Sequence, residues 1–345
     1  MTTHDPAAPP STALTPEQPV RVRLRTPGDL VASLPALLGY HARHSIVLVV
    51  LGGAPTVVHL TMRLDLPEDA DEVTWRAVAE CFAGGVSRTE AHHAMLVVLD
   101  GDADSTRALA GAVREALEPL GVELPDAIVV ADGRYRSVTC SDDTCCPPGG
   151  RPVPGSSALA AAAVTQGRVI HADREEMAAQ LAPPDPAGQR RAERVAALLL
   201  TTADHGSIGL EDDQVRDLLD RCCEQAGRAE LRLVDAVRLA LLVRVAELRD
   251  RAYRHMLDVG PQVHRQLWSS VCRQVPPTIS AVPLAMAALA SYLDGDGGMA
   301  NVAIERACEV DDTHPSVTLV RDVVHAVIRP RDVRDALARS LPPPG

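Results

Sequence analysis

The chain has 345 residues, of which 46% are hydrophobic and 23% charged, and its formal net charge is −12. This length allows two domains of ordinary size, each with its own core. Phosphate binding needs a concentrated surplus of basic residues, so an acidic chain predicts no nucleic-acid partner. All 34 basic residues are arginine, which is typical of a GC-rich bacterial genome. The absence of lysine excludes a P-loop lysine and a lysine Schiff base.

The sequence also predicts where the protein resides. No run of about 18 apolar residues occurs, so we predict no membrane span. Residues 1–19 are rich in Pro, Thr and Ala and lack the basic start and apolar core of a signal peptide, which predicts a disordered tail. Without an export signal, the eight cysteines are expected to be mostly reduced thiols in the cytoplasm.

Strand and helix patterns alternate in the first half of the chain. The expected strands are residues 20–25, 45–51, 56–65, 95–99, 127–130 and 169–171, and the expected helices are residues 30–38, 71–83, 106–120, 157–164 and 174–181. Strands that alternate with helices of this length predict a mixed, largely parallel sheet with packed helices. We therefore expect an α/β domain over residues 20–182, with a Cys-rich loop at 133–151.

A Pro-rich segment, Pro183-Pro184-Asp185-Pro186, predicts the boundary to a second domain. Beyond it only helical periodicity occurs, which predicts a helical domain over residues 183–341, followed by a short tail at 342–345. The helices between residues 280 and 328 carry small residues on their faces, as antiparallel tetratricopeptide-like hairpins do. The expected helices are residues 189–203, 212–226, 231–257, 261–273, 280–293, 299–309, 315–327 and 331–340.

Several segments together resemble a bacterial family known as domain-of-unknown-function family 4192. They are residues 34–40 with 45–47, residues 63–67, Gly133-Arg134-Tyr135-Arg136-Ser137 leading to Cys140 and Cys145-Cys146-Pro147-Pro148, then Trp268, Arg273, residues 295–297, Ala300 and Ala303. The Cys-Cys-Pro segment is the most specific of them. The resemblance implies a bacterial origin and an extent covering most of the chain beyond the tail, but no activity.

The cysteine cluster of Cys140, Cys145 and Cys146 is open to three interpretations. Thiolates bind Zn²⁺, and a structural zinc site has four ligands, so the fourth would be His171, or His92 or His93 from elsewhere in the fold. Neighbouring arginines would favour a reactive or redox thiol, although two adjacent aspartates oppose this. In the third interpretation, the cysteines only pack as small apolar side chains in a turn.

Three aspartates follow predicted strands, namely Asp100, Asp102 and Asp132. In open α/β sheets ligands bind beyond the carboxyl ends of strands, so these carboxylates would converge there and hold Mg²⁺ with a phosphate-bearing substrate. Asp-Gly after a strand is also ordinary turn chemistry. Farther on, the acids at Asp294, Asp296 and Glu305 lack the remaining ligands of an EF-hand loop, which favours a turn between two helices.

Other chemistry-bearing residues lack a recognisable motif. Cys222 and Cys223 lie within a predicted helix, and His255 and His264 flank a helix break. Cys222 and Cys223 have no further ligands nearby in sequence, which favours structural roles. No Ser or Cys motif accompanies His255 or His264. The signatures of serine hydrolases, zincins and dinucleotide-binding proteins are absent.

Two functional hypotheses follow. The first is a non-enzymatic binding or scaffolding protein with a protein or small-molecule partner, because no complete catalytic motif occurs. The second is an enzyme with a metal- or thiol-dependent site near the cysteine loop and the strand-end aspartates, with zinc as the candidate cofactor.

Overall fold

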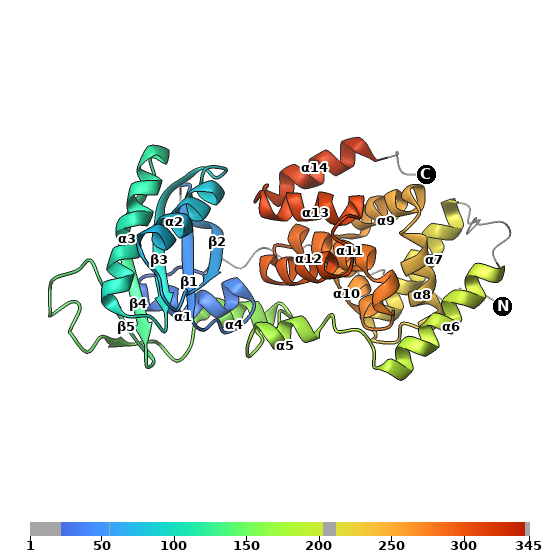
Figure 1. The fold of residues 1–345 in the computed structure, drawn as a ribbon, viewed down its shortest axis with the longest axis horizontal. Helices are drawn as coiled ribbons and strands as arrows, with labels where there is room; N and C mark the ends of the chain where they lie inside the picture. Colours follow the sequence, from blue (N-terminus) through green and yellow to red (C-terminus); the bar gives the residue numbers. More distant parts are fainter. Residues whose placement is uncertain (1–21, 55, 203–211, 342–345) are drawn as a thin grey trace, which may run out of the picture.

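The computed structural model describes residues 22–54, 56–202 and 212–341 (Figure 1). The tails predicted at residues 1–19 and 342–345 lie outside this part of the chain. All strands lie at one end of the molecule, and helices α6 to α14 form the other end. The segment carrying α4 and α5 connects the two ends.

A six-stranded mixed sheet forms the first half, with the strand order β2-β1-β3-β4-β5-β6. The strands are β1 (Ser45–Gly52), β2 (Val57–Asp65), β3 (Ala91–Leu99), β4 (Glu123–Ala131), β5 (Arg134–Ser137) and β6 (Arg151–Pro152). Among the six strands that the structure describes, only β3 and β4 pair in parallel, so the prediction of a largely parallel sheet is wrong. Short turns after β1 and β4 make hairpins, and a hairpin forces its two strands to run antiparallel.

Helices cover both faces of this sheet. In β1, Ile46, Leu48 and Val50 pack toward α2 (Glu72–Val86) and α3 (Ala103–Leu117). The alternate residues, Val47 and Val49, belong to the cluster that contains α1 (Pro27–Leu38). Because both faces are covered, β1 is a continuous apolar run, as its sequence predicts.

Two predicted strands are absent from the residues that the structure describes, and two short strands were not predicted. Residues 22–25 carry no strand, and Val169 to His171 form only a single bridge, between His171 and Tyr40. β5 and β6 lack the apolar run that marks a buried strand. The turn before β5 is made by Asp132 and Gly133, both at positive φ (51° and 69°), which is the geometry of a tight hairpin.

The remaining elements are helical. They are η1 (Glu118–Leu120), α4 (Ala158–Thr165), α5 (Arg174–Ala179), α6 (Pro186–Thr202), α7 (Asp212–Gly227), α8 (Leu233–Leu242), α9 (Ala246–Val259), α10 (Pro261–Cys272), η3 (Pro277–Ile279), α11 (Ala281–Leu293), α12 (Gly297–Asp311), α13 (Pro315–His325) and α14 (Pro330–Ser340). The single helix predicted over residues 231–257 is interrupted between Leu242 and Ala246, so it forms α8 and α9. The tetratricopeptide-like character of the later hairpins stays a prediction.

The two halves are joined by apolar and polar contacts. Leu38 of α1, Met177 of α5 and the core of the helical half belong to one continuous hydrophobic cluster. At the rim, Arg329 forms an ion pair with Glu90 at 2.9 Å. The predicted domain boundary at residues 183–186 stays a prediction, and α6 begins within it, at Pro186. Among the described residues, no helix is both long and apolar enough to cross a membrane.

Candidate ligand-binding site

The three loop cysteines come together, as their spacing predicts. The Sγ atoms of Cys140, Cys145 and Cys146 all lie within 4.8 Å of one another. His171, the proposed fourth ligand, is not part of this group; its backbone pairs with Gly39 and His41 beside α1. Burial and the neighbouring thiols raise the pKa of Cys146 to about 11, which favours the protonated thiol there.

The strand-end aspartates are only partly brought together. Asp100 and Asp102 line one cavity of about 720 Å³ at the end of β3, whereas Asp132 lies in the β4–β5 turn and is not among its lining residues. Asp102 caps α3 by accepting hydrogen bonds from the backbone of Asp104 and Ser105, both at 2.9 Å. The Ser105 N–H holds the pKa of Asp102 below its ordinary value. These contacts explain Asp102 as a helix cap.

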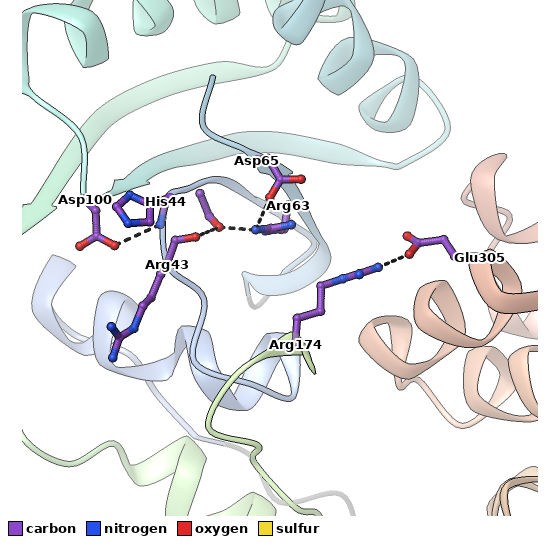
Figure 2. A network of polar contacts seen from close by, with 8 residues as sticks. Arg43, His44, Arg63, Asp65, Asp100, Arg174 and Glu305 are labelled. Atoms are coloured by element: carbon purple, nitrogen blue, oxygen red, sulfur yellow. Dashed lines mark hydrogen bonds and ion pairs between the residues drawn. The ribbon is translucent and has the colours of Figure 1, made fainter. Parts of the chain in front are cut away.

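The carboxylate of Asp100 also has a structural partner, since it accepts a hydrogen bond from the His44 backbone at 3.0 Å (Figure 2). In the same view, Arg63 forms an ion pair with Asp65 at 2.6 Å, and Arg174 of α5 reaches Glu305 of α12. The end of the sheet is therefore a region of paired charges. Only Asp100 and Asp102 share a cavity there, and the expected convergence of all three carboxylates stays a prediction.

A cavity of about 270 Å³ lies where the two halves meet. It is bounded by the end of α1, by the segment between α4 and α5, by α10 and by the turn between α11 and α12. Its lining residues with polar side chains are Arg168, His171, Gln180, Arg265, Gln266, Ser269, Ser270, Arg273 and Asp296. A second cavity of about 330 Å³ adjoins it, because Leu37, Arg168 and Gly295 line both.

Charge in this cavity is unequally matched. Arg265 contacts the carboxylates of Asp294 and Asp296, each at 3.2 Å. Burial raises the pKa of Asp294 above its ordinary value, although Arg265 acts in the opposite direction. Arg168 and Arg273 add two further guanidinium groups to the lining. The lining therefore holds three guanidinium groups and one carboxylate, that of Asp296, which favours an anionic occupant.

The lining side chain of His171 has a buried polar atom without a hydrogen-bond or ion-pair partner among the described residues. His171 is 8% exposed, and its Nδ1 makes no hydrogen bond to any described residue. Its backbone is fixed, because its N–H donates to Gly39 at 2.9 Å and its carbonyl accepts from His41 at 3.1 Å. Leaving such a group unpaired costs roughly 1–3 kcal/mol. His171 is therefore fixed in the lining of the cavity, with one buried nitrogen left without a hydrogen bond.

A second polar cluster is buried inside the helical half. His255 of α9 and His264 of α10 are 3% and 0% exposed, and their rings are joined by a 2.8 Å hydrogen bond between His255 Nδ1 and His264 Nε2. The chain of contacts continues to Asp220 of α7 at 3.0 Å and to Trp268 at 3.1 Å. The Sγ of Cys223 lies within 4.8 Å of both rings.

Trp268, at one end of this series of hydrogen bonds, determines the direction of each bond in it. The indole N–H of Trp268 can only donate, so His264 Nδ1 accepts and its Nε2 carries the proton. His264 Nε2 then donates to His255 Nδ1, and His255 Nε2 donates to the Asp220 carboxylate. A metal ion at Cys223 and these two nitrogens would have to displace the proton of His264. The cluster is therefore a hydrogen-bonded chain rather than a preformed metal site.

Sequence reasoning missed both buried arrangements. The sequence places His255 and His264 on either side of a helix break, at Gly260 and Pro261, and this position was a usable signal. A helix break of this kind folds two helices back on each other and brings flanking residues together. No comparable local signal marks His171, because its neighbours in the cavity come from distant helices.

Fold and site together define a mixed α/β protein with a helical second half and a polar cavity at the junction. The chain belongs to the family described as domain of unknown function DUF4192, whose model matches residues 27–331. This confirms the resemblance seen in the sequence. No curated protein and no solved structure was found to match the chain.

Proposed function

We propose that this protein binds a small anionic molecule in the cavity between its sheet half and its helical half. The observation that carries the proposal is His171, whose buried Nδ1 has no partner among the described residues. An acceptor that reached this buried nitrogen would supply the missing hydrogen bond. Pockets for small molecules occur preferentially at such junctions, and about 270 Å³ suits a compact ligand.

The other lining groups match a carboxylate or phosphate. Arg168 and Arg273 provide positive charge, and the guanidinium group is suited to planar, bidentate recognition of these anions. Ser269 and Gln266 add neutral donors. This lining favours binding over catalysis, because it offers donors and charge without a nucleophile hydrogen-bonded to a base.

The variant His171→Leu separates ligand binding from a purely structural role. Leucine removes the unpaired nitrogen, so the free energy of unfolding of the ligand-free protein should rise by about 1 kcal/mol. Binding should weaken at the same time. These opposite effects are measured by urea denaturation and by isothermal titration calorimetry. A loss of stability in the leucine variant would contradict the role assigned to His171.

Ligand class is tested with a panel of inorganic phosphate, a dicarboxylate, a nucleoside monophosphate and a diamine. We expect an anion to stabilise the protein, by about 2.7 kcal/mol at a concentration 100-fold above its dissociation constant. Arg273→Gln should weaken this binding, whereas Arg114→Gln, an exposed arginine of α3, should not. Equal binding of the diamine, or unchanged affinity in the Arg273 variant, would refute an anion site.

A further inference from the structure

The cysteine loop between β5 and β6 lies at the end of the molecule away from helices α6 to α14 (Figure 1). Two of its thiols, those of Cys140 and Cys145, are exposed, and Cys146 is half-buried. A free cysteine is ordinarily one of the most buried residue types. The exposure therefore counts against simple packing, which was one of the three interpretations of this cluster.

Two arginines hold the loop in shape from its flanking strands. Arg134 of β5 donates to the carbonyls of Gly149 and Gly150, at 2.6 and 2.7 Å. Arg151 of β6 donates to the carbonyls of Cys145 and Thr144, at 2.7 and 3.1 Å. Each guanidinium group thus closes the loop across many residues. The cysteine backbone is fixed by contacts that do not involve sulfur.

Further hydrogen bonds set the two ends of the cysteine segment. The Cys140 N–H donates to Ser137 Oγ at 3.0 Å, and that hydroxyl donates to Asp126 of β4. The Cys146 N–H donates to the Asp142 carbonyl at 2.7 Å. The Asp142 carboxylate accepts from the Thr144 N–H at 2.8 Å, so it shapes the turn. Folding of the loop therefore already orders the three thiols, so little further conformational entropy is lost when a ligand binds.

We propose that Cys140, Cys145 and Cys146 bind one Zn²⁺ ion as three thiolates, with the fourth position open to solvent. Each thiol releases its proton to solvent, and three Zn–S bonds form without a change of oxidation state. Zn–S bonds of about 2.3 Å in a tetrahedral site place sulfurs ~3.8 Å apart, so thiols already within 4.8 Å of one another need only a small contraction. The guanidinium groups of Arg134 and Arg151 offset the net negative charge of the complex.

The site is independent of the junction cavity, and it goes beyond the proposed ligand-binding function. Its open position has the form of zinc sites that accept a water or an external ligand. Thiolates also favour Cu⁺, which shares this soft-ligand chemistry, and an oxidised pair would instead be a disulfide. A test must therefore separate zinc from copper and from oxidation.

The experiment titrates the full chain, reduced and stripped by chelator, with Zn²⁺ and, in parallel, with Co²⁺ and Cu⁺. One equivalent of Zn²⁺ should bind and protect three thiols from a thiol-specific reagent, and Co²⁺ should give a thiolate-to-metal charge-transfer band. Cys145→Ser and Cys146→Ser should each lose about 100-fold or more in Zn²⁺ affinity, since even an outer contact to a metal ligand is worth about 10–100-fold. Arg151→Gln, which keeps all three thiols, should weaken binding about 10-fold by loosening the loop.

Controls decide the remaining outcomes. Cys81→Ser changes an exposed cysteine of α2 outside the cluster and should leave binding intact. Circular dichroism melts check that each loop variant is folded. Unchanged zinc affinity in both serine variants would overturn the proposal. Binding of Cu⁺ without any binding of Zn²⁺, or a disulfide among these cysteines in freshly purified protein, would also overturn it.

Discussion

Replacing Gly298 by alanine should destabilise the junction between the two halves by about 2 kcal/mol. Gly298 lies in the first turn of α12, and a Cβ there would overlap the Leu38 carbonyl oxygen at the end of α1. The obstacle is backbone, so it cannot rotate away as a side chain can. Overpacking of this kind costs roughly 1–3 kcal/mol. The free energy of unfolding is measured by urea denaturation.

Gly297→Ala is the matched control for this substitution. It adds the same methyl group one residue earlier, where a Cβ would meet no atom within 4 Å. The two tryptophans report the halves separately, because Trp75 lies in α2 and Trp268 in α10. We expect Gly298→Ala to lower anion affinity as well, since Gly295, Asp296 and Met299 line the cavity. Equal stabilities of the two alanine variants would show that the junction does not depend on this close approach.

Local sequence patterns predicted the strands and helices whose buried positions follow a regular pattern along the chain. β1 is apolar throughout because both its faces are covered, and the helices of the second half follow their hydrophobic periodicity. Strand direction was not predictable in this way. A short apolar run has the same composition in a parallel and an antiparallel pair, and the direction depends on the connections, such as the hairpins after β1 and β4.

The same holds for the candidate sites: residues close in sequence were predictable as neighbours, and residues from distant segments were not. Cys140, Cys145 and Cys146 are close in sequence, so their proximity in space was predictable from one loop. Asp132 followed a predicted strand but lies in a hairpin turn, because Asp-Gly readily adopts positive φ. His171, Arg265 and Asp296 come from three distant segments. Whether a buried atom such as His171 Nδ1 has a hydrogen-bond partner depends on how these distant segments pack together, which local sequence does not reveal.

Acid should destabilise the helical half through His264, and this is the largest effect expected from a single titrating group. Burial lowers the pKa of His264 from 6.5 to about 3, and the nearby His255 acts in the same direction. In the unfolded chain the imidazole takes up a proton below about pH 6.5, whereas in the folded protein it stays neutral down to about pH 3. The unfolded state therefore binds more protons across this window, so stability falls as the pH falls.

The expected loss follows from the width of that window. Each pH unit below the unfolded pKa removes about 1.4 kcal/mol, so the contribution lost by pH 4.5 is on the order of 2–3 kcal/mol. His264→Gln removes the titrating ring but keeps an acceptor for the Trp268 N–H. This variant should be less stable at pH 7, because the bond to His255 is disturbed, and its stability should depend less on pH between 6.5 and 4.5.

The measurement is urea denaturation at intervals from pH 7 to pH 4.5, followed by the fluorescence of Trp268 in a Trp75→Phe background. His92→Gln, an exposed histidine of β3, is the matched control and should keep the pH dependence of the parent. Carboxylates outside the buried chain contribute equally to the parent and to both variants, so the difference between their slopes reports the chain from Asp220 to Trp268. If His264→Gln and His92→Gln lose stability equally as the pH falls, the buried chain from Asp220 to Trp268 does not control the acid response.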